Sequence, residues 1–338
     1  MNIFISYRNF EENESIINTT GDYNICYGIK LLCEKYDHFI YISENNFYKH
    51  KLQDYNNIVK YYNSEINAII IIEGLTKRLN YPNKVKQFKY IVDIHGHDIN
   101  KYCNINLLLP YAYSYNRYNY TPNKEKIYFF PHSIKYNVEF NKNPIHKVLL
   151  SGRGRKNIFR YPMRAFMYNQ HLQNNNIDYL KPDHSYRTTP DKLEYITSGQ
   201  KYINKLNKYL CCFTDDLSIY SPYLICKFFE ILSSGSLLLA SVKNTKIYFK
   251  NLGFIDGIHY ISMNTENFKE KINYILNNQN REEIDKIRYN GYILANQYHT
   301  SEHRAKQLIE IINNTSNVVC YKDGIDLGQY YLVKNNIS

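Results

Sequence analysis

Short apolar runs alternate with polar, helix-compatible stretches along the whole chain. In the N-terminal half these runs are continuous in β-branched and aromatic residues, which is typical of parallel strands buried on both faces. Strands are therefore predicted at 3–7, 39–43, 68–73, 90–94, 107–109 and 127–130. Apolar residues at helical spacing predict helices at 23–36 and 54–63 between them.

The C-terminal half repeats this alternation more clearly. Its predicted strands are 147–151, 177–180, 209–214, 237–242 and 259–262. One predicted helix starts near Pro162. The other predicted helices span 191–207, 223–234, 245–251, 266–277, 282–297 and 302–313. A capping box of Asn280 and Glu283 is predicted to open the helix at 282–297. Repeated strand–helix units predict an α/β protein with a doubly wound parallel sheet in each half. Ligands of such sheets lie at the carboxyl ends of the strands.

A polar segment that ends in Pro144 separates the two halves. A chain of 338 residues exceeds the usual size of one domain, so two domains are expected. We predict an N-terminal domain over 1–143, a C-terminal domain over 144–315 and a tail over 316–338, with a cleft between the two sheets.

Charge and cysteine usage exclude only a few classes of partner and site. The net charge is +11, from 42 Lys and Arg against 31 Asp and Glu, which favours anionic partners such as phosphates, nucleic acid or acidic membranes. Seven cysteines without a CxxC pair do not predict a disulfide framework or a zinc site. The N-terminus lacks a signal-peptide pattern and the longest apolar run is too short to cross a bilayer, so a cytoplasmic protein is expected.

Residues 221–240, SPYLICKFFEILSSGSLLLA, form the strongest candidate site. On a helix that starts at Tyr223, Lys227 and Glu230 share the face opposite the apolar one. Free N–H groups at its N-terminus, near Ser221, suit a phosphate; Lys227 would add charge and Glu230 would accept hydrogen bonds from sugar hydroxyls. An ordinary amphipathic helix with solvated charges is the alternative. Small residues at 233–236 permit close approach of a ligand or of another backbone segment.

A basic glycine-containing loop, SGRGRK at 151–156, follows a predicted buried strand. Gly152 would let the backbone close on a pyrophosphate, and Arg153 would bind phosphate oxygens with paired hydrogen bonds. A flexible basic surface loop is the alternative. Arg164 is predicted in the first turn of the next helix, where a cation opposes the helix dipole and therefore points to an anionic partner.

Two acidic segments invite a metal-site interpretation. Asp93 and His95 lie in IVDIHGHDI, 91–99, at the end of a predicted strand, where metal binding, a structural role and a catalytic role remain open. Asp215 and Asp216 are adjacent, so their side chains diverge and a loop cap is the better interpretation.

The segment KFFEILSSGSLLLA, 227–240, resembles the donor-site motif of GT-B nucleotide-sugar glycosyltransferases, where a helix bearing a Glu leads through small residues to an apolar strand. A basic residue three positions before that Glu makes it most similar to the CgeB-like, or spore-protein-like, branch. Segments 149–164, 253–261 and 299–308 agree in order, so the resemblance covers roughly 147–312.

The resemblance implies a GT-B fold of two Rossmann-like domains, with the tail packing back on the first. By similarity Glu230 would hold the nucleotide ribose, and Lys227 with Arg153 the diphosphate. Many retaining members carry a second Glu eight residues earlier, where this chain has Pro222. That departure leaves the donor-sugar contact and the stereochemistry open.

The predicted function is therefore transfer of a sugar from a nucleotide diphosphate donor to a hydroxyl of a glycan or other acceptor. Neither a metal nor a cofactor is expected, and nucleic acid is not an expected partner. If the reaction inverts configuration, His95 or Asp93 is the candidate base. Alternatives are a nucleotide-sugar epimerase of the same architecture, a basic nucleic-acid-binding protein and an inactive scaffold.

Overall fold

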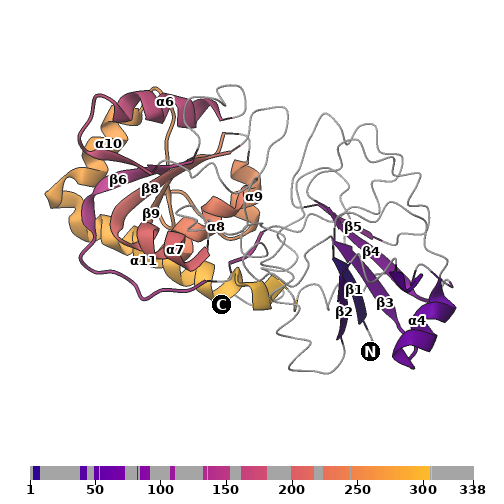
Figure 1. Ribbon diagram of the computed structural model, residues 1–338. Coiled ribbons are helices and arrows are strands. Elements are labelled where there is room, and N and C mark those ends of the chain that lie inside the picture. The colour runs from indigo at the N-terminus through magenta and orange to yellow at the C-terminus, as the bar shows by residue number, and fades with distance from the viewer. Residues whose placement is uncertain are drawn as a thin grey trace. The chain divides into compact units, whose positions relative to one another are not determined.

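The computed structural model describes residues 3–7, 39–43, 49–52, 54–72, 82, 84–91, 107–110, 132–134, 136–152, 161–180, 199–216, 224–243, 245–304 and 306. Two compact units make up the chain (Figure 1). Unit 1 comprises Met1–Pro131 and Ser301–Ser338, and unit 2 comprises His132–Thr300. Each unit is described by itself below.

Unit 1 contains a five-stranded parallel sheet in the order β2-β1-β3-β4-β5. Its strands are β1 (Ile3–Tyr7), β2 (Phe39–Ser43), β3 (Ala68–Ile72), β4 (Lys86–Ile91) and β5 (Leu107–Pro110). Four of these lie where the apolar runs predicted them. The exception is β4, which starts at Lys86 instead of residue 90, because polar Lys86 and Gln87 hide its beginning from a search for apolar runs.

One helix of unit 1 is described, α4 (Tyr55–Tyr62). Asp54 caps its start by accepting a hydrogen bond from the Asn56 amide at 2.9 Å. Asn63 ends it in the left-handed region, with φ of 49°. The helix predicted at 23–36 and the strand predicted at 127–130 lie outside the described residues.

Unit 2 contains a second five-stranded parallel sheet, in the order β10-β9-β8-β6-β7. Its strands are β6 (Ile145–Ser151), β7 (Ile177–Leu180), β8 (Tyr209–Asp215), β9 (Leu237–Ser241) and β10 (Ile261–Ser262). Its helices are α6 (Pro162–His171), α7 (Gly199–Asn207), α8 (Cys226–Ser233), α9 (Lys246–Asn251), α10 (Phe268–Leu276), the short 3₁₀ helix η6 (Asn278–Asn280) and α11 (Arg281–Tyr298). The predicted α/β architecture is confirmed.

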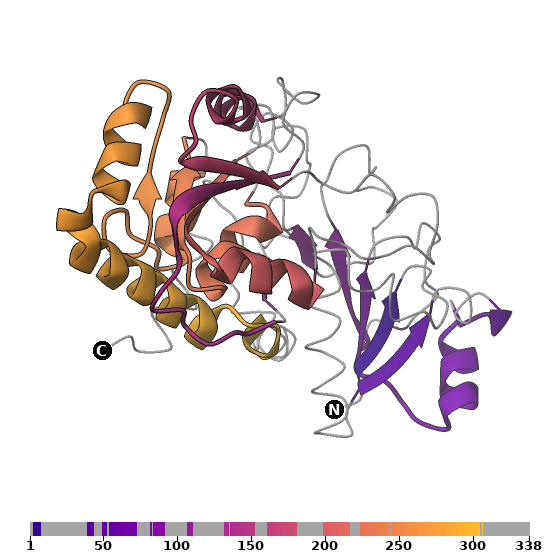
Figure 2. The ribbon, with the colours of Figure 1, turned by 60° about the vertical axis from the view of Figure 1, so that its left-hand side comes forward.

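Helices cover both faces of the unit 2 sheet (Figures 1 and 2). Alternate strand residues such as Val148, Phe213 and Leu239 pack in one core with the apolar faces of α6, α10 and α11. Because strand side chains alternate between faces, Leu149 and Leu238 point to the other face, where α7 and α8 lie. Burial on both faces explains why the strands read as continuous apolar runs.

The order of the strands places the candidate site. In both sheets the first strand lies between the second and third. The strand order therefore reverses between the first and third strands of each sheet, and the chain extends the sheet in opposite directions from these two strands. In sheets of this order ligands bind at the carboxyl ends of the strands on either side of the reversal. In unit 2 that pair is β6 and β8, which end at Ser151 and Asp215.

One predicted helix start and one predicted helix cap are wrong. Helix α8 begins at Cys226, not at Tyr223, because Leu224 and Ile225 are buried in extended backbone before it. At the start of α11, Asn280 makes no side-chain cap hydrogen bond. The chain enters that helix through the 3₁₀ turn η6, which Asn277 caps instead.

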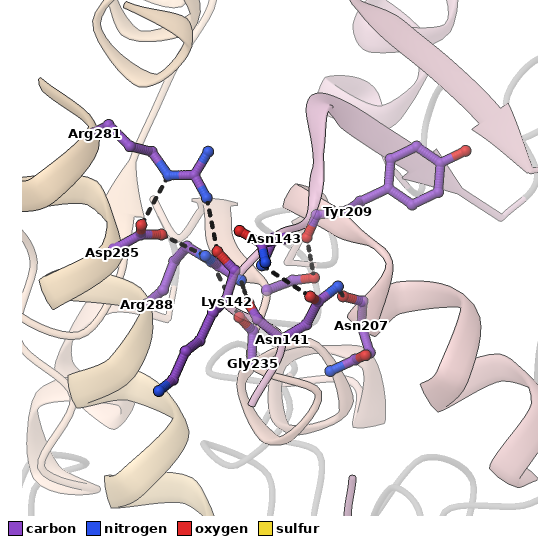
Figure 3. Close-up of polar contacts among 10 residues, drawn as sticks. Asn141, Lys142, Asn143, Asn207, Tyr209, Gly235, Arg281, Asp285 and Arg288 are labelled. Carbon is purple, nitrogen blue, oxygen red and sulfur yellow. Dashed lines mark hydrogen bonds and ion pairs between the residues drawn. The ribbon is translucent and has the colours of Figure 1, made fainter. Parts of the chain in front are cut away.

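Residues 136–143, which we call the strap, precede β6 and lie against unit 2. The Arg288 guanidinium donates to the Gly235 carbonyl at 3.1 Å and to the Asn141 carbonyl at 3.0 Å, and it pairs with Asp285 (Figure 3). Arg281 donates to the Lys142 carbonyl at 3.4 Å. The compact unit accordingly begins at His132, ahead of the boundary that we predicted at 143/144.

The strap also accounts for Gly235, one of the small residues at 233–236. Gly235 has φ of +78°, and a methyl group added there would lie 2.9 Å from Cδ2 of Phe140. The close approach is therefore made by another chain segment and not by a ligand. Among the described helices, none has the length and apolar content needed to cross a bilayer.

Candidate active site at the carboxyl ends of β6 and β8

The first side of the site is the end of β6. Ser151 is buried, and the chain leaves the strand through Gly152 with φ of +106°, a conformation that glycine adopts without strain. The Tyr179 hydroxyl donates to the Gly152 carbonyl at 2.9 Å and fixes this turn.

The second side is the start of α6. Pro162 occupies the first turn, as predicted, and puts Arg164 at the third helical position. Arg164 is buried, and its guanidinium lies 3.9 Å from the centre of the Tyr161 ring. Its Nη2 lies 2.9 Å from Oδ1 of Asp215, while its backbone N–H donates to Oδ2 of the same carboxylate at 2.7 Å.

The third side is the first turn of α8, where Lys227 is partly buried. Its ammonium donates to the Ser151 hydroxyl oxygen at 3.2 Å and lies 5.5 Å from the centre of the Tyr202 ring. Tyr202 is fully buried on α7, and its hydroxyl hydrogen-bonds with that of Ser151 at 2.7 Å. Lys227 is thus held against the end of β6 and is not a solvated surface lysine.

The two cations meet over one glycine. A methyl group added at Gly152 would lie 3.0 Å from Nζ of Lys227 and 3.3 Å from Nη1 of Arg164. The two nitrogens are therefore no farther apart than the sum of these distances. Because Gly152 has no side chain, both cations approach its backbone, and any larger residue would push them away.

Electrostatics show that the cations repel one another. Burial and the like charge of Arg164 lower the pKa of Lys227 to about 7. Burial raises the pKa of Glu230 to about 7, against the opposing effect of Lys227. Burial also raises the pKa of Asp215, which the adjacent Arg164 opposes. A bound anion would relieve the repulsion between Lys227 and Arg164, so the arrangement suits a phosphate or diphosphate.

Of the predicted donor-binding residues, the structure brings Gly152, Arg164, Lys227 and Glu230 together in unit 2. The other predicted site residues lie outside the described residues: Arg153, Ser221, Tyr223, Asp93 and His95. Their roles stay predictions.

Sequence reasoning missed three residues of the site. Ser151 and Tyr202 hold Lys227, and Asp215 holds Arg164; each is a buried polar residue at or beside the end of a buried strand. The side chains of Asp215 and Asp216 do diverge, since Asp216 accepts from the Thr245 hydroxyl at 3.2 Å. Within the described part of the chain, no three His, Cys, Asp or Glu side chains are grouped to hold a metal ion.

Comparisons with known proteins agree with this geometry. Residues 196–310, which include Tyr202, Asp215, Lys227 and Glu230, match the family model described as "Glycosyl transferase-like". Three solved structures are similar over nearly the whole chain. The first is an alpha-glucosyltransferase in complex with UDP-glucose and DNA containing an abasic site, with 11% identity and a TM-score of 0.57 over 93% of this chain and 100% of that one. The second is a glycosyltransferase from Rickettsia africae ESF-5, with 12% identity and a TM-score of 0.54 over 94% of this chain and 98% of that one. The third is the Anabaena protein HepE in complex with UDP and glucose, with 9% identity and a TM-score of 0.51 over 93% of this chain and 99% of that one.

The chain has the GT-B fold. The glycosyl transferase-like segment includes α7, β8, α8 and β9 of unit 2. These elements carry the third side of the candidate site, with Lys227 and Tyr202, and also Asp215, whereas β6 and α6 precede the matched segment. No curated protein sequence matches the chain.

Proposed function

We propose that the chain is a glycosyltransferase that moves a sugar from a nucleotide diphosphate donor to a hydroxyl of a glycan or other acceptor. The observation that carries the proposal is the meeting of Lys227 and Arg164 over Gly152 at the strand-order reversal of unit 2. The glycosyl transferase-like family match and the GT-B fold give the reaction class.

In this proposal Lys227 and Arg164 bind the donor diphosphate, together with Arg153. As the sugar leaves, negative charge grows on the diphosphate, and fixed cations stabilise it without reorganising. Glu230 lies one helical turn beyond Lys227 and accepts hydrogen bonds from the ribose. The two cations take the place that a metal ion has in other transferases, so transfer is expected to persist in EDTA.

Further assignments rest on the sequence. The CgeB-like branch, the tail that packs on the first domain, a cytoplasmic location and a base at His95 or Asp93 remain predictions. The expectation that nucleic acid is not a partner is open as well, because one similar structure was solved with DNA. DNA therefore belongs among the acceptors to be tried.

The first experiment is a thermal-shift screen of the wild-type protein with UDP-, GDP-, CMP- and dTDP-sugars. A donor that binds only the folded protein raises the melting temperature by mass action, by an amount set by its concentration relative to Kd. Turnover is then measured with the best donor in the presence of candidate acceptors. Conversion of the nucleotide-sugar to its epimer in the absence of any acceptor would identify an epimerase instead.

Lys227→Ala and Glu230→Ala test the assigned site. Each is expected to lower turnover strongly, for Lys227 by roughly 10²–10³-fold, as for the loss of one donor to a developing oxyanion. The matched control is Lys208→Ala, which removes the same charge from an exposed position just before β8, at the opposite edge of the sheet. Unchanged turnover in both site variants, with the fold intact, would reject the site.

A further inference from the structure

One carboxylate in the site, that of Asp215, contacts Arg164 through both of its oxygens. Asp215 is the last residue of β8 and is fully buried. Its Oδ2 accepts the Arg164 amide at 2.7 Å, and its Oδ1 lies 2.9 Å from the Arg164 guanidinium. A single side chain thus contacts both the backbone and the charged end of Arg164.

The backbone contact replaces a missing helix cap. The residue before α6, Tyr161, makes no side-chain cap hydrogen bond, so the N-terminal amides of this helix need an acceptor from elsewhere. Asp215 supplies it from another strand. Its carboxylate also offsets the unfavourable placement of a cation, Arg164, at the positive end of the helix dipole.

The contact with the guanidinium restricts where Arg164 can point. Asp215 holds Nη2, the Tyr161 ring lies against the guanidinium plane, and Nη1 is left facing Gly152. Among the described residues, neither the buried Nε nor the buried Nη2 of Arg164 has a hydrogen-bond partner, so the contact of Nη2 with Asp215 is an ion pair. The side chain is therefore fixed on two sides and keeps N–H groups for an incoming acceptor.

We propose that Asp215 is a positioning residue, which fixes Arg164 beside Lys227 so that the guanidinium binds the diphosphate of the donor. This inference rests on the proposed function, since it concerns the same diphosphate site. Asp215 does not itself contact the donor. It acts through Arg164, by capping α6 and by setting the direction of the guanidinium.

The charge of Asp215 and its positioning of Arg164 predict opposite effects of Asp215→Asn on diphosphate binding, so one substitution can distinguish them. A carboxylate near a diphosphate repels it, so charge alone predicts that Asp215→Asn tightens binding. If Asp215 positions Arg164, the same substitution weakens binding, because asparagine can still accept from the amide but no longer pairs with the guanidinium. The measured sign decides between the two.

The experiment titrates the full-length protein with UDP, GDP, CDP and dTDP by calorimetry and uses the tightest of them for the variants. Asp215→Asn is expected to weaken binding about tenfold, the loss typical of one hydrogen bond to a charged group. The matched control is Asp216→Asn, a buried neighbour whose side chain accepts from Thr245. It should keep the wild-type Kd to within about twofold.

A double variant separates positioning from general damage. If Asp215 acts only through Arg164, Asp215→Asn changes Kd no further in an Arg164→Ala background, since coupled residues are not additive. Further weakening there, or unchanged or tighter binding by Asp215→Asn alone, would overturn the inference while the proposed function stands. Absence of wild-type binding to all four nucleotides would instead reject the proposed function, and the inference with it.

Arg164→Lys provides the test if Asp215→Asn does not fold. Lysine keeps the charge and can pair with Asp215, but its single ammonium cannot also face Gly152. We expect about the same tenfold loss as for Asp215→Asn. Wild-type affinity in Arg164→Lys would show that charge suffices, and would overturn the inference.

Discussion

At the scale of single residues, the surroundings of Lys227 lower its pKa, and this predicts a proton uptake on ligand binding that can be measured. Burial and Arg164 lower its pKa to about 7, so near neutral pH a substantial fraction of the side chain is uncharged in the free protein. A diphosphate placed beside it favours the charged form and raises that pKa again. We therefore expect binding above about pH 7 to be coupled to uptake of a proton.

We predict that UDP, or whichever nucleoside diphosphate binds best, takes up protons on binding at pH 8. The affinity should then fall as the pH rises from 7 to 9, because the ammonium form is the one that binds. Calorimetry in two buffers of different ionisation enthalpy measures the proton count directly. Lys227→Met, of similar length and without a titrating group, should reduce the uptake to the part that Glu230 contributes; equal uptake in this variant would place the titrating group elsewhere.

The sequence predicted part of the site for identifiable reasons. Lys227 and Glu230 stand out because they interrupt an apolar helix three positions apart, and Gly152 because it ends a buried strand. Asp215 and Tyr202 carry no such signal, since each works through a contact more than ten positions away in the sequence. Which distant partner a buried polar side chain meets is decided by the sheet order, and apolar periodicity does not contain that information.

At the scale of elements, the contact of α11 with the strap centres on one buried arginine, Arg288. Arg288 is 1% exposed, and the oxygens of Gly235, Asn141 and Asp285 surround its guanidinium (Figure 3). Its neighbour on the helix, Arg281, pairs with the same Asp285 but is more exposed. The two arginines share Asp285 as a partner, but Arg288 is buried and binds two carbonyls, whereas Arg281 is partly exposed and binds one, at 3.4 Å.

Arg288→Met is expected to lower the free energy of unfolding by about 3 kcal/mol, because one buried carbonyl group, one partly buried carbonyl group and a carboxylate lose their donor. Arg281→Met should cost less than about 1 kcal/mol, since a partly exposed ion pair contributes little. Urea unfolding of both variants measures the difference. Equal losses would mean that the strap is not held by the buried arginine.

Apolar periodicity located most elements but not all of their ends. Strands such as β1, β2 and β7 were predicted to the residue, because these short, mainly apolar segments are flanked on both sides by polar residues. Helix α8 was started too early, because Leu224 and Ile225 fit a helical apolar face and an extended buried segment equally well. An apolar residue predicts that its side chain is buried, but it does not predict whether the backbone is helical or extended.

At the scale of the whole molecule, the sequence predicted two α/β units, and the boundary between them was predicted at 143/144 from the composition of the segment before Pro144. Pro144 and the polar residues before it look like a linker. Four strap residues are nevertheless bound through their backbone carbonyls, those of Val138, Glu139, Asn141 and Lys142. Every residue offers a carbonyl, so the side-chain pattern gives no sign that the strap belongs to unit 2.

This difference in boundary predicts how fragments of the chain behave. A fragment of residues 132–300 keeps the strap and all described residues of the diphosphate site, so it should unfold cooperatively and bind the preferred nucleoside diphosphate. A fragment of residues 144–300 leaves Arg288 without the Asn141 carbonyl and Gly235 without the Phe140 ring against it. The loss of several such contacts, each about 1 kcal/mol, should lower its melting temperature by roughly 10 °C. Calorimetric scans of both fragments measure this, and equal melting temperatures would show that the domain begins at Pro144 after all.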